Sequence, residues 1–68
     1  MKHYERIRAL REDKDLSQTQ ISEKIGITQR AYSYYETGDR MIPPEILCAL
    51  ADFHNVSVDY LLGRTDKP

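Results

Sequence analysis

The sequence lacks the features that brace a small secreted domain or carry a chain through a membrane. Its 68 residues include one cysteine, Cys48, so no disulfide can form within the chain, and we expect a reducing compartment. No run of about 18 apolar residues, the length that crosses a bilayer, is present. The first six residues, Met-Lys-His-Tyr-Glu-Arg, lack the apolar stretch of a secretion signal. We therefore expect the protein to be cytoplasmic, with no membrane partner.

An excess of charge of either sign is also missing. Ten Lys and Arg residues against eleven Asp and Glu residues give a formal net charge of −1, with a pI near 6.1. The whole chain therefore has no general attraction for nucleic acid, although a local basic surface can still bind it.

The sequence is poor in groups that perform catalysis or hold a cofactor. Its two histidines, His3 and His54, are too few for a structural zinc site, which needs four ligands. Cys48 and His54 fall on different faces of a helix, and no carboxylate completes a catalytic set with them. No glycine-rich phosphate loop is present. We expect no enzymatic activity, metal, cofactor or small-molecule substrate, and we interpret Cys48 as a small residue that packs against another helix.

The most informative pattern is a repeat of helix signals. An apolar residue, a hydroxyl residue and a second apolar residue four positions later occur twice, each time followed by glycine: Leu16, Ser17, Ile21 and Gly26, then Ile27, Thr28, Tyr32 and Gly38. The hydroxyl can cap a helix, the two apolar residues can pack together, and glycine favours the left-handed exit. The connector of three residues, 26–28, fits a helix-turn-helix better than an antiparallel hairpin.

The remaining periodicity predicts an all-α fold, a compact five-helix bundle whose helices 2 and 3 form the helix-turn-helix. Gln20 completes a capping box with Ser17, Pro44 suits the first turn of the fourth helix, and Gly63 ends the fifth. The expected helices cover 3–14, 18–25, 29–37, 44–54 and the segment after Ser57. We expect residues 1–63 to form the domain and 64–68 a tail or the start of a linker. The predicted core contains Ile7, Leu10, Leu16, Ile21, Ile25, Ile27, Tyr32, Tyr35, Leu47, Leu50, Ala51, Val56, Val58, Leu61 and Leu62.

The third predicted helix has one inward and one outward face. At about 100° per residue the inward face contains Thr28, Tyr32, Tyr35 and Glu36, and the outward face contains Gln29, Arg30, Ser33, Tyr34 and Thr37. Gln pairs with adenine and Arg with guanine through two hydrogen bonds each, so Gln29 and Arg30 are the leading base readers. Ser33 and Tyr34 lie one turn later, within reach of a base edge, a phosphate or a thymine methyl.

This helix has two other interpretations. It can be an ordinary solvated helix, since any exposed helix face carries such polar residues, but the preceding cap-turn-cap pattern favours contact with DNA bases. The three tyrosines suggest a stacking platform for single strands. Periodicity opposes this idea, because Tyr32 and Tyr35 point inward and leave Tyr34 alone outside.

Several linked motifs cover most of the chain, from about Ile7 to Gly63. In order they are Ile7-Arg8-Ala9-Leu10-Arg11, Leu16-Ser17-Gln18, Ile25-Gly26-Ile27-Thr28, Tyr35-Glu36-Thr37-Gly38-Asp39-Arg40 and Asn55-Val56-Ser57-Val58-Asp59-Tyr60-Leu61-Leu62-Gly63. They resemble the helix-turn-helix domain of lambdoid phage repressors, Cro proteins and their bacterial relatives, including regulators of the xenobiotic-response-element type. Tyr32 departs from that pattern, since a smaller branched residue is common there.

The resemblance implies a five-helix domain that binds operator DNA as a homodimer, with the third helix in the major groove. It implies base contacts from Gln29, Arg30 and Tyr34, to which the helical period adds Ser33. It implies contacts to the DNA backbone from Gln18, Thr28, Thr37 and Arg40, with the loop from Thr37 to Met41 along the strand. By the same resemblance Gln18 braces the first reader, Arg11 and Glu36 form an ion pair, and the fifth helix or the tail forms the dimer contact. The alternative for Arg11 and Glu36 is two unrelated surface charges.

Electrostatics set this chain apart from a strongly basic DNA binder. From Ser17 to Ile42 the basic residues Lys24, Arg30 and Arg40 are matched by Glu23, Glu36 and Asp39. Because each neutralised phosphate adds about 0.9 to the salt slope, we predict a slope shallower than about −8 per dimer. The same balance keeps a second hypothesis open: a protein-interaction module or antitoxin with this fold and little intrinsic DNA binding.

Overall fold

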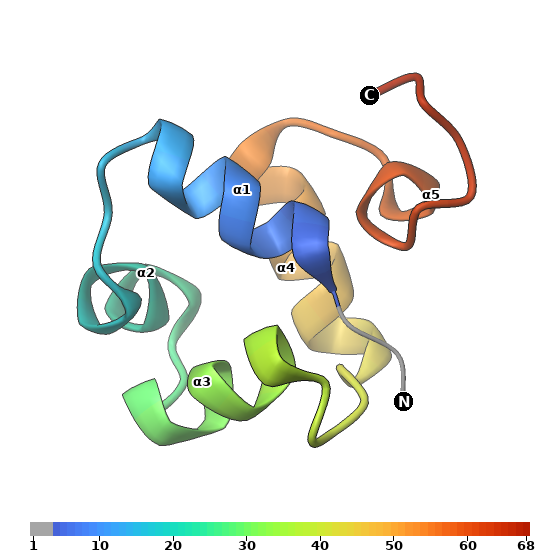
Figure 1. Ribbon diagram of the computed structural model, residues 1–68. Helices are drawn as coiled ribbons and strands as arrows, with labels where there is room; N and C mark the ends of the chain where they lie inside the picture. The colour runs from blue at the N-terminus through green and yellow to red at the C-terminus, as the bar shows by residue number, and fades with distance from the viewer. Residues whose placement is uncertain (1–3) are drawn as a thin grey trace.

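The structure, a computed structural model, describes residues 4–68 and contains five α-helices over that range (Figure 1). Their bounds are α1 Glu5–Asp13, α2 Gln18–Ile25, α3 Gln29–Thr37, α4 Pro44–His54 and α5 Val58–Leu61. The all-α five-helix prediction is confirmed, and α2 and α3 have the predicted bounds. The first helix is shorter than the expected range, and its predicted start, His3, lies outside the described residues.

Side-chain caps explain where the two central helices begin. The Ser17 hydroxyl accepts a hydrogen bond from the Gln20 backbone N–H at 3.0 Å, and the Gln20 side chain accepts one from the Ser17 N–H at 2.8 Å. This is the predicted capping box. The Thr28 hydroxyl likewise accepts from the Ala31 N–H at 3.1 Å and begins α3.

Left-handed residues end α2, α3 and α4. Gly26 with a φ of 85° closes α2, and Gly38 with a φ of 81° closes α3. Asn55, a residue type that tolerates this region, ends α4 with a φ of 57°. At α5 the helix ends at Leu61, two residues before Gly63, which takes the left-handed conformation in the turn that follows.

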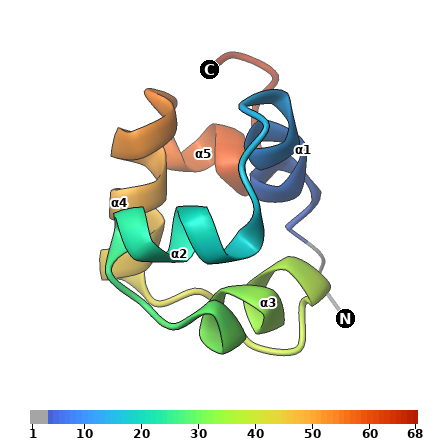
Figure 2. The ribbon, with the colours of Figure 1, turned by 90° about the vertical axis from the view of Figure 1, so that its left-hand side faces the viewer.

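The helix-turn-helix lies at one end of the molecule. Figures 1 and 2 show α3 along the lower edge, with α2 directly above it and α5 and the C-terminal segment at the upper end. α2 packs on both α3 and α4, whereas α1 packs on α3 and α5. One side of α3 therefore faces away from the other helices. Within residues 4–68, no helix is both long and apolar enough to span a bilayer.

The core joins all five helices. Predicted core residues that are buried are Ile7, Ile21, Tyr32, Tyr35, Leu50, Ala51 and Leu61. The other predicted members are partly buried against them: Leu10, Leu16, Ile25, Ile27, Leu47, Val56, Val58 and Leu62. Tyr4, Ile42 and His54 are also buried and were missing from the prediction. Tyr4 falls within the predicted first helix, at the spacing of Ile7 and Leu10, although it lies just before α1 in the structure. Ile42 lies in a loop, where helical period gives no signal.

Candidate nucleic-acid interface

The outward face of α3 is polar and accessible. Gln29, Arg30 and Thr37 are exposed, and Ser33 and Tyr34 are half-buried. Beneath them Tyr32 is fully buried and Tyr35 nearly so. The inward and outward tyrosines are therefore divided as the periodicity predicts, and a bulky Tyr32 is accommodated inside the core.

A buried ion pair joins α1 to α3 directly under this face. The Arg11 Nε donates to Glu36 Oε2 at 2.6 Å, and its Nη2 donates to Glu36 Oε1 at 3.2 Å. The Glu36 side chain is 4% exposed and that of Arg11 is 12% exposed. Arg11 also donates to the Leu16 carbonyl at 2.8 Å, so one guanidinium ties the two helices to the loop before α2. The two residues are not unrelated surface charges.

The pair keeps Glu36 ionised despite its burial. Burial alone would raise the pKa of the Glu36 carboxyl, but hydrogen bonds, chiefly from Arg11, lower that pKa below its ordinary value. The same bond to Glu36 outweighs desolvation and raises the pKa of Arg11. Burial first, and then the neighbouring Glu36 carboxylate, raise the pKa of Tyr32, so its hydroxyl stays neutral. That buried hydroxyl lies beside Glu36 but makes no hydrogen bond of standard geometry within residues 4–68.

A hydrogen-bond relay extends from the ion pair to the surface. Gln18 Nε2 donates to Glu36 Oε1 at 3.0 Å, and Gln29 Nε2 donates to Gln18 Oε1 at 2.8 Å. A carboxylate can only accept, so Gln18 must turn its amide nitrogen toward Glu36 and its oxygen toward Gln29. Gln29 must then donate to Gln18, which leaves the Gln29 carbonyl oxygen and one N–H free. One acceptor and one donor on a planar amide match the N6 and N7 edge of adenine.

The second half of the face is built around Tyr34. Arg30 Nε donates to the Tyr34 hydroxyl at 3.2 Å. Arg40, from the loop after α3, lies with its guanidinium carbon 4.7 Å from the centre of the same ring. These side chains, with Thr28 and Ala31, line a shallow hollow of about 250 Å³.

The two threonines assigned to the DNA backbone are held differently. The Thr28 hydroxyl accepts its cap bond and keeps its own hydrogen available for a donor contact. The Thr37 hydroxyl lies 2.8 Å from Asp39 Oδ2 and 3.1 Å from the Tyr34 carbonyl. It has a single hydrogen, which these acceptors share within the loop. Thr37 therefore stabilises the path of the loop toward Arg40.

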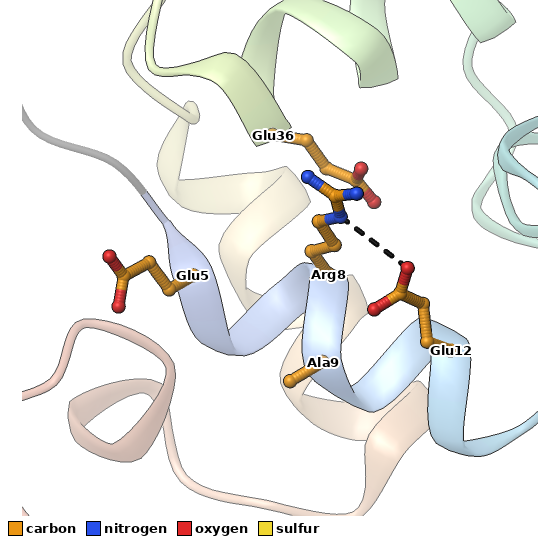
Figure 3. A pocket seen from close by; sticks show the side chains of 5 residues that line it. All are labelled: Glu5, Arg8, Ala9, Glu12 and Glu36. Atoms are coloured by element: carbon orange, nitrogen blue, oxygen red, sulfur yellow. Dashed lines mark hydrogen bonds and ion pairs between the residues drawn. The ribbon is translucent and has the colours of Figure 1, made fainter.

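A larger hollow of about 390 Å³ lies on the α1 side, away from the outward face of α3 (Figure 3). Glu5, Arg8, Ala9, Glu12 and Glu36 line it, and Arg8 pairs with Glu12 at 3.5 Å. Three carboxylates around one arginine disfavour a phosphate. The hollow beside Tyr34 has two arginines and no carboxylate in its lining, so the electrostatics favour that smaller site for DNA.

The interpretation of Cys48 as a packing residue is wrong, because its side chain is exposed. Ile46, Leu47, Leu50, Ala51 and His54 form the packed side of α4, and Cys48 lies on the opposite side at about 100° per residue. His54 is buried on the packed side. Residues 4–68 contain no group of three or more side chains placed to hold a metal ion.

A family model described as helix-turn-helix matches residues 7–61. The chain belongs to the helix-turn-helix family. The resemblance noted in the sequence is confirmed, and α2, the turn and α3 form the motif that gives the family its name. Arg11, Gln18, Gln29 and Glu36 all lie within the matched residues.

Two curated relatives are transcriptional regulators by name. The chain is 44% identical over 64 residues to the HTH-type transcriptional regulator YobD of Bacillus subtilis, covering 94% of this chain and 57% of YobD. It is 36% identical over 64 residues to the cryptic phage CTXphi transcriptional repressor RstR of Vibrio cholerae, covering 94% of this chain and 57% of RstR. The helix-turn-helix chain spans about half the length of the curated relatives it matches.

A solved structure shares the whole fold. The P22 c2 repressor protein, solved in complex with a synthetic operator, superposes with a TM-score of 0.85 at 30% sequence identity. The match covers 96% of this chain and 100% of that chain. The fold of this helix-turn-helix chain is therefore that of the P22 c2 repressor.

Sequence reasoning missed how Tyr34 is used. The spacing of four between Arg30 and Tyr34 places them on one helix face and signals their contact. Arg40 reaches the same ring only because the loop after Gly38 turns back toward α3, and no periodicity reports such a turn.

Proposed function

We propose that this domain binds a specific double-stranded DNA sequence as part of a transcriptional regulator, and that it acts as a repressor by occupying its operator. The observation that carries the proposal is the hydrogen-bond relay through Gln18. It fixes Gln29 on the exposed face of α3 and connects it to the buried, ionised Glu36, which is paired with Arg11. A polar group fixed before binding loses less conformational entropy when it meets a base. The likeness to the P22 c2 repressor, solved with a synthetic operator, supports the same conclusion.

In the proposed complex α3 lies in the major groove. Gln29 and Arg30 read base edges, and Ser33 and Tyr34 lie one turn further along the same face. Gln18, Thr28 and Arg40 donate to the sugar-phosphate backbone and fix the register, and Thr37 lies along it with the loop that it stabilises. Two subunits bind a pseudo-palindromic operator whose half-sites lie about one helical turn, or ~34 Å, apart.

Fewer acidic side chains are exposed to DNA phosphates than the sequence alone suggests. Glu36 is buried and paired with Arg11, so it opposes DNA less than its formal charge suggests. The exposed charges of the same segment are Lys24, Arg30 and Arg40 against Glu23 and Asp39. We still predict a modest salt dependence, with a slope shallower than about −8 per dimer. A steeper slope would mean more phosphate contacts than these residues provide.

The test is selection of bound duplexes from a random pool, followed by titration of the selected duplex. We expect one motif with two related half-sites and a stoichiometry of two chains per duplex. Gln29→Ala should relax the preference at one base pair, by roughly 5- to 100-fold. Cys48→Ser is the matched control, because Cys48 is exposed and lies on α4, outside the helix-turn-helix. Failure to enrich any sequence would refute specific binding.

The second candidate is a protein-interaction module or antitoxin, and the near balance of exposed charges favours it. Titration of labelled random duplex at low salt separates the two. A DNA reader should bind in about the micromolar range or tighter, whereas the interaction module should not bind.

A further inference from the structure

Tyr34 lies against two arginines that approach it from different parts of the chain. The Arg30 side chain, one turn earlier on α3, donates from Nε to the Tyr34 hydroxyl at 3.2 Å. The Arg30 guanidinium carbon is 5.9 Å from the ring centre, and that of Arg40 is 4.7 Å from it. Two like charges beside one ring are held together by the negative face and the hydroxyl of the tyrosine.

The backbone places Arg40 at this ring. After Gly38 the chain turns back, and the N–H groups of Asp39 and Arg40 approach the Tyr34 carbonyl at 3.0 and 3.4 Å. The bond between Thr37 and Asp39 closes the same turn. Tyr34 thus anchors the loop with its backbone and receives the Arg40 side chain with its ring.

We propose that Tyr34 is a positioning residue that sets the direction of both arginines, instead of reading a base with its own ring. This inference rests on the proposed DNA-binding function. With Nε engaged by the hydroxyl, Arg30 keeps its two terminal nitrogens free, and these match the O6 and N7 acceptors of guanine. The ring holds Arg40 where a phosphate can meet it, at the edge of the hollow that lacks carboxylates.

Two substitutions separate the hydroxyl from the ring. Tyr34→Phe removes the acceptor for Arg30 and keeps the surface under Arg40. Tyr34→Leu removes both. The matched control is Tyr35→Phe, which removes a tyrosine hydroxyl from the inward side of the same helix.

The duplex used is the one selected from the random pool, with the base pair at which Arg30→Ala loses preference defined as the Arg30 base pair. For Tyr34→Phe we expect discrimination at this pair to fall roughly 3- to 10-fold, with at most about a twofold change on random duplex. For Tyr34→Leu we expect the same loss and, in addition, roughly 3- to 10-fold weaker binding to every duplex. Tyr35→Phe should change neither quantity.

A measurement without DNA tests the geometry itself. Protons of the Arg40 side chain should show an upfield ring-current shift in the NMR spectrum of the wild type and of Tyr34→Phe, and lose it in Tyr34→Leu. Two results would overturn the inference while leaving DNA binding intact. One is that Tyr34→Phe lowers discrimination equally at all base pairs, and the other is that Tyr34→Leu leaves the Arg40 proton shifts unchanged. Absence of binding by the wild type would instead refute the proposed function, and the inference with it.

Discussion

Each end of the molecule contains an arginine that lies on a tyrosine ring, but the two arginines differ in how many of their hydrogen-bond donors are engaged. At the end formed by α5 and residues 64–68, Arg6 lies 4.2 Å from the centre of the Tyr60 ring. At the α3 end, Arg40 lies 4.7 Å from the centre of the Tyr34 ring. Each pair places a guanidinium on a tyrosine beside a chain segment that has just left a helix.

The difference lies in what the rest of each guanidinium does. Arg6 donates to the carbonyls of Tyr60 and Thr65 and to Asp66, so its hydrogen-bonding groups serve the fold. Arg30 donates once, to Tyr34, and the Arg40 side chain makes no hydrogen bond within the part of the chain that is described. Spare donors on a preformed surface support the proposal that the α3 end meets the acidic ligand.

The largest expected effect comes from breaking the Arg11–Glu36 ion pair beneath the α3 end. Glu36→Ala leaves the Arg11 charge 12% exposed and without its partner, so we expect a loss of about 3–5 kcal/mol in the free energy of unfolding. Urea denaturation measures it. The double variant Arg11→Met with Glu36→Leu should recover most of the loss, because it strands no charge. A loss below about 1 kcal/mol in Glu36→Ala would mean that the pair behaves as an exposed one.

The next test asks whether the spare donors act on DNA. Arg40→Ala should weaken binding to every duplex by a similar factor, roughly 3- to 30-fold, because a phosphate contact carries no sequence information. Arg30→Ala should act at a single base pair. Arg6→Ala, at the other end, should leave the preference at every base pair as in the wild type when measured under conditions where it is folded. Uniform losses from both Arg30→Ala and Arg40→Ala would contradict the assignment of readers.

The comparison also shows which parts of the molecule a sequence reveals. The caps at Ser17 and Thr28 were predictable, because the hydroxyl and the N–H that it accepts lie within three residues. The inward direction of Tyr32 and Tyr35 followed from helical period alone. Both signals are local, and they suffice for the helix-turn-helix and for the outward direction of Gln29.

Contacts that depend on the path of a loop were not predictable in this way. Ile42 is buried by the return of the chain from α3 to α4, and Arg40 reaches Tyr34 by the same turn. Cys48 shows a different error. Cysteine is often buried, but helical period already placed it opposite the packed residues of α4, and period was the better guide.

A third, smaller test contrasts two buried titratable groups. Glu36, on the inward side of α3, has partners that keep it charged, whereas both ring nitrogens of buried His54 have no hydrogen-bond partner within residues 4–68. Burial first, and then the charge of Lys14, lower the pKa of His54 below its ordinary value. The unfolded chain therefore binds this proton at a higher pH than the folded chain does.

The sign of the effect follows from this linkage. The stability that His54 contributes is complete above its ordinary pKa of about 6.5 and falls as the pH decreases toward the folded pKa, by at most about 1.4 kcal/mol per pH unit. Thermal unfolding between pH 7.5 and 5, measured in a His3→Gln background, reports this slope. His54→Gln should be less stable throughout but should lack that part of the slope. An unchanged slope would assign the effect to other groups.

The smallest expected effect is at the α5 end, where the donors of Arg6 already have partners within the chain. The Arg6 ion pair with Asp66 has a distance of 2.9 Å, yet the Asp66 side chain is fully exposed. Solvent screens such a pair and its ordering costs side-chain entropy, so Asp66→Ala should not measurably change urea denaturation. Arg6→Ala should lower the free energy of unfolding more than Asp66→Ala, because it also removes the contact with the Tyr60 ring and the hydrogen bonds to two backbone carbonyls. Equal costs would mean that the exposed carboxylate, and not the ring and carbonyls, holds this arginine, and the contrast between the two ends would lose its physical basis.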